Sequence, residues 1–183
     1  MDYDRIILGI DPGTNITGYG AIGIVKNEPR VISLGVIDLK KISDHYLKLK
    51  HIFERTLGLI DEYKPDEMAI EAPFYGKNVQ SMLKLGRAQG ASMSAALHRS
   101  VPIYEYAPRK IKMSITGVGA ASKEQVAAML MNILGFKDNN IILDATDGLA
   151  AALCHFYQSN RPVSEKNYNS WKEFMKKNPG RVK

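Results

Sequence analysis

The sequence predicts an α/β fold in which a mixed five-stranded sheet carries helices on both faces. The first observation behind this is an apolar run at residues 6–10, typical of a strand buried on both faces at the centre of a sheet. The second is that two more strand-like segments follow before strand and helix patterns begin to alternate. The third is that a chain of 183 residues with 45% hydrophobic content is long enough for one hydrophobic core and short for two.

A hairpin is expected directly after this first strand. Residues 17–25 and 30–39 alternate in hydrophobicity, and residues 26–29 have the composition of a turn. Gly18 and Gly20 weaken the first of these two strands, but they allow another backbone or a ligand to approach closely.

The rest of the body alternates between helices and strands. Helices are expected at residues 43–63, 78–100, 109–116, 122–134 and 144–158, and strands at residues 67–72 and 101–106. In the second helix, Gly86 and Gly90 lie on one face and let another helix come close. Packing on the protein's own sheet and a contact with a second subunit would both use that face.

Positive charge is concentrated at the C-terminal end. The chain has a net charge of +6, and residues 161–183 hold seven Lys or Arg against two Glu. We therefore expect one domain at residues 1–160 and a basic tail at residues 161–183. Tyr168, Trp171 and Phe174 recur in the tail at near-helical spacing, which indicates a short amphipathic helix that docks on the body, lies on DNA or binds a partner.

The cysteine content and the early apolar run bear on the compartment. Cys154 is the only cysteine, so neither an internal disulfide nor a cysteine zinc site is expected. The apolar run follows the acidic Asp2 and Asp4, unlike a signal peptide, and is too short to span a membrane. We expect a cytoplasmic protein without a membrane partner.

Two carboxylates end strands of the predicted sheet. Asp11 ends the first strand, and Pro12 holds it in an extended conformation. Glu71 ends the strand at residues 67–72. If the two strands are parallel neighbours, both side chains meet at the edge where α/β sheets tend to place their sites. The alternative for Asp11 is that it only opens an Asp-Pro-Gly turn.

Asp144 and Asp147 complete a set of four. They are three residues apart at a helix start, so they lie on the same side of the helix. The alternative for each one taken singly is that it only interacts with the positive end of the helix dipole. A cluster of four carboxylates would cost stability without a cation, because two like charges about 5 Å apart repel by roughly 3 kcal/mol at a dielectric constant near 20. His155 lies about 12 Å along the helix from Asp147, too far for one metal shell.

Such a set of hard oxygen ligands suits Mg²⁺, with Mn²⁺ as a substitute. Two such ions can hold the attacking water and the leaving oxygen of a phosphodiester hydrolysis. We therefore expect Asp11, Glu71, Asp144 and Asp147 to be the catalytic residues and the ligands of two ions.

Aromatic and basic residues near these positions indicate a nucleic-acid surface. Phe74 and Lys77 follow the Glu71 strand end, where an aromatic ring could stack on an unpaired base or instead pack into the core. Arg109, Lys112 and Lys123 are candidates for phosphate contacts, although each Lys could equally be a solvated surface charge. The glycine-rich link before Lys123 lacks the P-loop spacing, so no nucleotide cofactor is expected.

These segments together resemble the RuvC-type Holliday junction resolvases of the RNase H-like superfamily. The resemblance is carried by residues 7–13, 69–71, 74, 77–78, 83–86 and 144–147. It implies a dimeric endonuclease that cuts two strands of a four-way DNA junction symmetrically, with Mg²⁺ at the four carboxylates. Some members carry histidine at the Asp144 position, whereas this chain has a carboxylate at all four.

The resemblance also implies roles outside the metal site. It places Phe74 at a base-stacking position, and Lys112 and Lys123 near the cut phosphate. It makes the helix that carries Gly86 the dimer helix of a homodimer. A branch-migration helicase complex is the expected partner.

Three other interpretations share part of this pattern. Actin-like and sugar kinases also place an Asp-x-Gly-Thr loop after a strand, but they need two such domains. A non-catalytic junction-binding module would share the fold, although it would not need four carboxylates. A related nuclease that acts on RNA would use the same chemistry.

Overall fold

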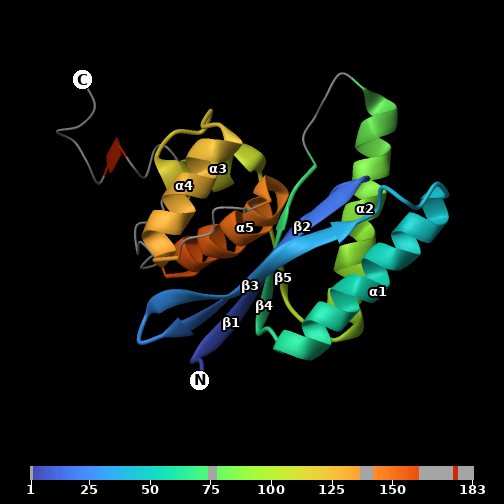
Figure 1. Ribbon diagram of the computed structural model, residues 1–183. Coiled ribbons are helices and arrows are strands. Elements are labelled where there is room, and N and C mark those ends of the chain that lie inside the picture. The colour runs from blue at the N-terminus through green and yellow to red at the C-terminus, as the bar shows by residue number, and fades with distance from the viewer. Residues whose placement is uncertain (1, 74–77, 137–141, 161–174, 177–183) are drawn as a thin grey trace.

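The protein is described here by a computed structural model that covers residues 2–73, 78–136, 142–160 and 175–176 (Figure 1). One sheet has the strand order β3-β2-β1-β4-β5. Its strands are β1 (Arg5–Asp11), β2 (Ile16–Val25), β3 (Glu28–Asp38), β4 (Glu67–Glu71) and β5 (Ile103–Tyr106). The helices are α1 (His45–Tyr63), α2 (Val79–His98), α3 (Pro108–Thr116), α4 (Lys123–Leu134) and α5 (Leu143–Ser159).

The sheet is mixed, as the sequence predicts. Strands β1, β2 and β3 pair antiparallel, whereas β4 pairs parallel with both β1 and β5. The hairpin turn is shorter than expected, because Lys26 and Asn27 both adopt positive φ and Val25 already pairs with Glu28. Pro29 therefore lies inside β3, which is an edge strand and tolerates the missing backbone donor.

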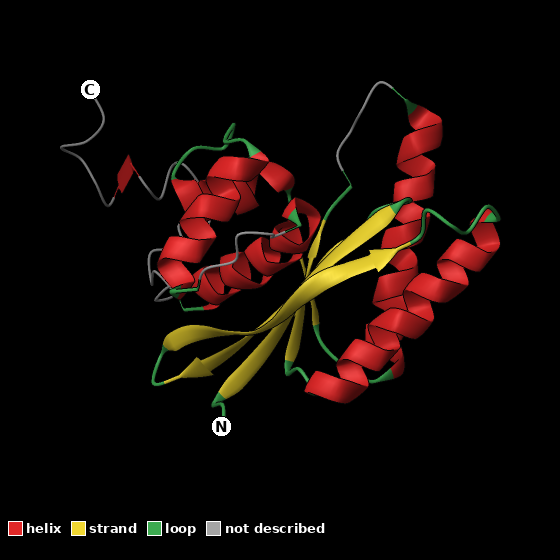
Figure 2. Ribbon diagram, in the orientation of Figure 1, coloured by secondary structure: helices red, strands yellow, loops and turns green. Residues whose placement is uncertain are grey.

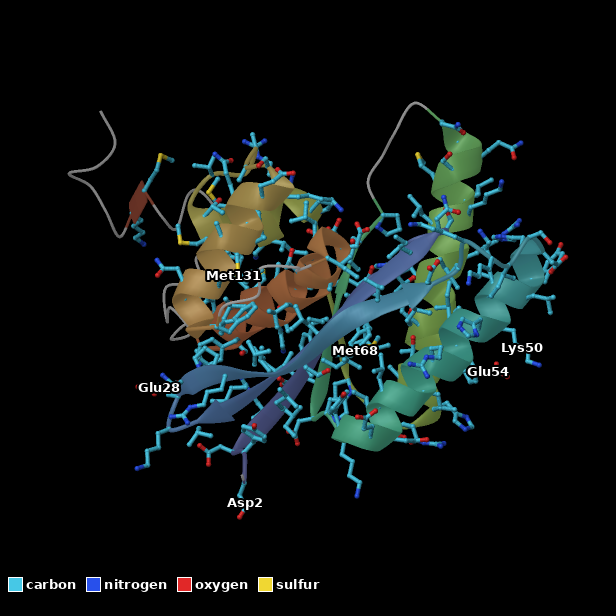
Figure 3. All side chains as sticks on the ribbon, in the orientation of Figure 1. Asp2, Glu28, Lys50, Glu54, Met68 and Met131 are labelled. Carbon is cyan, nitrogen blue, oxygen red and sulfur yellow. The ribbon has the colours of Figure 1, made fainter. Side chains whose placement is uncertain are left out.

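Helices cover both faces of the sheet, which confirms the predicted arrangement (Figure 2). Side chains alternate along β1, so that Ile7 joins the core beneath α5 while Leu8 and Ile10 join the core beneath α1 and α2. On β4, the fully buried Met68 lies on the α1 and α2 side (Figure 3). The helices α3, α4 and α5 gather on the opposite side (Figure 1).

Helix α5 lies directly against β1 and β2 because glycines leave no side chains between them. A Cβ atom on Gly18 would collide with the carbonyl oxygen of Asp144, and one on Gly20 would lie 2.5 Å from the Cα atom of Leu149. The predicted close approach at Gly18 and Gly20 is thus confirmed, and the approaching backbone is that of α5. This contact holds the start of α5 over the end of β1.

Gly86 and Gly90 have no such role within the chain. A Cβ atom added to either would meet no described atom within 4 Å. Close packing of this face on the protein's own sheet is therefore not observed.

The remaining predictions differ from the structure at element ends. Helix α1 begins after Asp44, whose side chain accepts a hydrogen bond from the backbone N–H of Leu47. Ser122 and Gln125 form the predicted capping box of α4.

Most of the tail at residues 161–183 lies outside the described residues, so its helix and the domain division stay predictions. None of the described helices is long and apolar enough to cross a membrane.

Candidate active site

The site begins at the carboxyl ends of β1 and β4. Gly9 and Ala69 pair across the two parallel strands, and both face α5. Because side chains alternate, Asp11 and Glu71, two residues further along, point to the same side at the same edge. The expected parallel pairing of these two strand ends is confirmed.

Helix α5 brings the other two carboxylates to this edge. Asp11 pairs with Gly18 across β1 and β2, and the backbone of Asp144 rests on Gly18. Asp144 and Asp147 lie in the first turns of α5. The side chain of Asp147 is 15% exposed and that of Asp144 is 37% exposed, so Asp147 is the more enclosed of the two.

Burial and mutual repulsion hold protons on these carboxylates. Burial, followed by the charge of Asp147, raises the pKa of Asp11 to about 7. Burial, followed by the charges of Asp11 and Asp147, raises the pKa of Glu71 to about 8. Burial also raises the pKa of Asp147, although Lys123 opposes this. Asp11 and Glu71 therefore need a compensating cation to ionise fully at neutral pH.

Lys123 supplies one positive charge from the start of α4. Its Nζ atom lies 2.9 Å from Oδ1 of Asp144 and 2.6 Å from Oδ2 of Asp147. Burial by itself lowers the pKa of Lys123, but the hydrogen bond to Asp144 and the ion pair with Asp147 outweigh it and the net pKa is raised. Within the chain this lysine pairs with the two carboxylates, and its contact with a DNA phosphate stays a prediction.

The carboxylate side chains are not arranged as a complete set of metal ligands. In the part of the chain that the structure describes, no three Asp, Glu, His or Cys side chains surround a common point as ligands. The donor set nevertheless fits a hard divalent cation, because it consists of carboxylate oxygens and the pKa values of Asp11 and Glu71 are raised. The ammonium of Lys123 compensates only Asp144 and Asp147 directly.

A cleft gives access to the first two carboxylates. It has a volume of about 230 Å³ and is lined by Asp11, Glu71, the residues that follow each of them, and Leu85 of α2. The cleft therefore runs between the sheet edge and the start of α2.

Polar residues that the sequence did not single out stabilise the turn after β1. Thr17 is fully buried, and its hydroxyl both donates to the carbonyl of Gly13 and accepts from its N–H at 3.2 Å. Lys48 of α1 donates from Nζ to the carbonyl of Thr14 at 2.8 Å and to Oδ1 of Asn15 at 3.1 Å. These bonds hold the turn that follows Asp11 at the end of β1.

Gln89 of α2 supports the end of β4 in a similar way. Its Nε2 atom donates to Oε2 of Glu105 at 2.8 Å and to the backbone carbonyl of Glu71 at 3.5 Å. A single glutamine in a helical pattern carries no sequence signal for this role.

The predicted DNA contacts divide into three groups. Phe74 and Lys77 lie outside the described residues. Lys112 is near the carboxylates, because its charge lowers the pKa of both Glu71 and Asp147. The stem of Arg109 instead packs on the link before α4, where a Cβ atom on Gly119 would lie 2.7 Å from its Cγ atom.

His155 is structural, as predicted. It is buried on α5, where it hydrogen-bonds the hydroxyl of Tyr106 at 2.6 Å and Oε2 of Glu67 at 3.0 Å. It also stacks on Tyr104 with ring centres 4.2 Å apart. Burial lowers its pKa despite the neighbouring carboxylate.

Comparison with known proteins decides the family. Residues 7–155 match the family model described as crossover junction endodeoxyribonuclease RuvC. The chain belongs to the RuvC family. It is 63% identical to the crossover junction endodeoxyribonuclease RuvC of Bacteroides fragilis, over 98% of this chain and 97% of that protein. It is 57% identical to that of Porphyromonas gingivalis, over 98% of each chain.

A solved member of the RuvC family shares the fold. The structure of T. thermophilus RuvC in complex with Holliday junction substrate superposes with a TM-score of 0.76 and 31% identity, over 84% of this chain and 94% of that one. This confirms the RNase H-like fold and the resemblance to RuvC-type resolvases. The chain is an endodeoxyribonuclease of the crossover-junction class, and its relatives give no support to the kinase, non-catalytic and RNA-nuclease interpretations. Membership of the family also implies dependence on a divalent metal.

Proposed function

We propose that the chain resolves four-way DNA junctions in recombination and repair by symmetric, Mg²⁺-dependent hydrolysis of two phosphodiesters. The observation that carries this proposal is that the carboxylates at the ends of β1 and β4 lie close enough to those at the start of α5 for their charges to raise one another's pKa values. The Holliday junction bound by the related T. thermophilus protein supports the choice of substrate.

Asp11, Glu71, Asp144 and Asp147 would hold two Mg²⁺ ions, which Mn²⁺ could replace. When bound, the ions supply the positive charge that activates water and stabilises the leaving oxygen. The rigid strand ends orient Asp11 and Glu71, and α5 orients the two aspartates. Once the carboxylates have this other counter-charge, the ammonium of Lys123 is available to a phosphate oxygen of the DNA, beside Lys112.

Three further residues would contact the DNA around the cut. In the sequence, Phe74 follows Pro73 of the cleft wall and Lys77 comes three residues later, so we expect a base to stack on Phe74 and a phosphate to contact Lys77. Arg109, which lies in α3, would contact the DNA backbone.

A homodimer would supply the second cut. Helix α2 exposes Val79, Leu83 and Leu97, and the face of Gly86 and Gly90 is open. Two copies that pair through this face would form an isologous contact with two sites, as a two-fold symmetric junction requires. A branch-migration helicase complex is the expected further partner.

The direct test is cleavage of a labelled synthetic four-way junction in Mg²⁺ and in EDTA, with a linear duplex and an RNA–DNA hybrid as controls. We expect paired nicks, symmetric about the junction, only with the metal. A junction that is bound but left uncut in both Mg²⁺ and Mn²⁺ would overturn the catalytic proposal, and cutting of the hybrid alone would overturn the substrate.

A further inference from the structure

A polar cavity beside the candidate active site has no role in the chemistry proposed above. Its volume is about 350 Å³, and its walls come from the turn after β1 and from the starts of α1 and α2. Figure 1 shows that both helices begin at the end of the molecule where β1 finishes. Leu85 lines this cavity and also the cleft of Asp11 and Glu71, so the two spaces adjoin.

The cavity is positively charged. Lys48 and Lys84 both line it, and none of the described residues in its wall is Asp or Glu. Lys48 uses two of its three N–H groups on the turn after β1, which leaves one donor and the charge for a ligand. Lys84 is exposed on α2.

The start of α2 adds to this charge. Its N-cap is the neutral Asn78, and no acidic residue lies in the first turn. The positive end of the helix is therefore not neutralised by a carboxylate of its own turn, and Ser81 of this turn lines the cavity.

The wall also contains a polar atom without a partner. Within the described residues, Nε2 of His45 is buried and makes no hydrogen bond. Ser43, like His45, lines the cavity from the start of α1. Two ammonium groups, a helix start and several neutral donors together suit an anion with several oxygen acceptors.

We propose that this cavity binds a backbone phosphate of the DNA, other than the phosphate that is cut. The proposal rests on the proposed function, because it takes the DNA strand to lie in the adjoining cleft. A strand that passes over Leu85 reaches the cavity without leaving the protein surface. Bound there, the phosphate positions the strand relative to Asp11 and Glu71 and takes no part in the reaction.

The test uses Lys84→Gln, because this side chain is exposed and is not among the proposed catalytic residues. Its matched control is Lys50→Gln, which removes the same charge from α1 where Lys50 pairs with Glu54 outside the cavity (Figure 3). Binding of the full-length chain to a four-way junction is measured in EDTA over a series of salt concentrations. The same junction is then prepared with single neutral methylphosphonates at successive positions flanking the cut.

We expect Lys84→Gln to reduce the slope of log binding constant against log salt by about 1 relative to the wild type and the control. One methylphosphonate position away from the cut should weaken wild-type binding and have no further effect in Lys84→Gln. If the slope and the methylphosphonate profile of Lys84→Gln match those of Lys50→Gln, the cavity does not hold DNA. Wild-type cutting in Mg²⁺ separates this failure from a failure of the proposed function.

Discussion

Asp11 and Glu71 are acids whose environment opposes their ionisation. Both sit at the end of a buried strand, and each lies near the charges of the other carboxylates. A single ammonium, that of Lys123, offsets part of this repulsion from the side of α5. At the scale of residues, the site is therefore poised to gain stability from an added cation.

This arrangement predicts how the stability of the metal-free protein depends on pH. The folded-state pKa values of about 7 for Asp11 and about 8 for Glu71 lie above those of the unfolded chain, so the folded state holds more protons between about pH 4 and pH 8. The free energy of unfolding should be highest below this window and fall through it by several kcal/mol, because one pKa unit corresponds to about 1.4 kcal/mol.

Thermal unfolding in EDTA from pH 6 to pH 9 measures this effect. Tm should decrease across the range, and Mg²⁺ should restore it at pH 8 and above. Glu71→Gln should flatten the decrease and abolish cutting, whereas the surface control Glu54→Gln should do neither. A wild-type Tm that stays constant with pH in EDTA would contradict the clustered geometry.

Lys123 has a separate, metal-dependent effect on stability. In EDTA, Lys123→Gln leaves the enclosed Asp147 without its ammonium partner and should lower the free energy of unfolding by about 1–3 kcal/mol. Saturating Mg²⁺ should remove most of this difference. Lys123→Arg keeps the charge and should lose less, as chemical denaturation can show. Equal losses with and without the metal would argue against Lys123 as a replaceable counter-ion.

At the scale of elements, the contact between α5 and the sheet sets the geometry of the site. The glycines of β1 and β2 let the helix backbone touch the strands, and the first turns of that helix carry two of the four carboxylates. A displacement of α5 would therefore separate Asp144 and Asp147 from Asp11 even if the fold survived.

Gly18→Ala tests this dependence. The added methyl group collides with the carbonyl oxygen of Asp144, so α5 must shift, at a cost of about 1–3 kcal/mol in stability. Cutting should fall by at least about 100-fold even at temperatures where the variant is folded. Gly58→Ala, in an open position on α1, is the control and should be neutral or stabilising by up to about 1 kcal/mol. Wild-type cutting by folded Gly18→Ala would show that α5 need not touch β2.

At the scale of the whole molecule, α2 joins the site to the proposed subunit contact. Its start borders the cleft and the polar cavity, Gln89 in its middle supports Glu71, and its exposed apolar face is open. A second copy bound to that face would lie close to both DNA-facing surfaces.

Gly86→Arg should separate the subunits and leave the fold intact, because no described atom lies within 4 Å of the added Cβ position. We expect the molar mass in light scattering to fall to that of a monomer and the paired nicks to become single, unpaired ones. Gly58→Arg places the same side chain on an open position of α1 and should stay dimeric. A wild-type protein that is already monomeric while it cuts in pairs would overturn the proposed interface.

The order of the elements, the mixed sheet, the carboxylates at two strand ends and a helix start, and the resemblance to the family could all be predicted before the fold was known. Each of these depends on local periodicity or on a short motif, so neighbouring residues carry the information. The positions of Asp11 and Glu71 followed because alternation and parallel pairing leave one arrangement at the sheet edge.

The partners that neutralise the carboxylate charges and hold the strand ends could not be predicted in this way. The pairing of Lys123 with Asp144 and Asp147, the hydrogen bonds of Gln89 and the cavity between α1 and α2 join residues that are far apart in the chain. A lone Lys or Gln has the same local pattern whether it faces water or a buried carboxylate. Its partner depends on which helices pack together, and that is settled by the core as a whole.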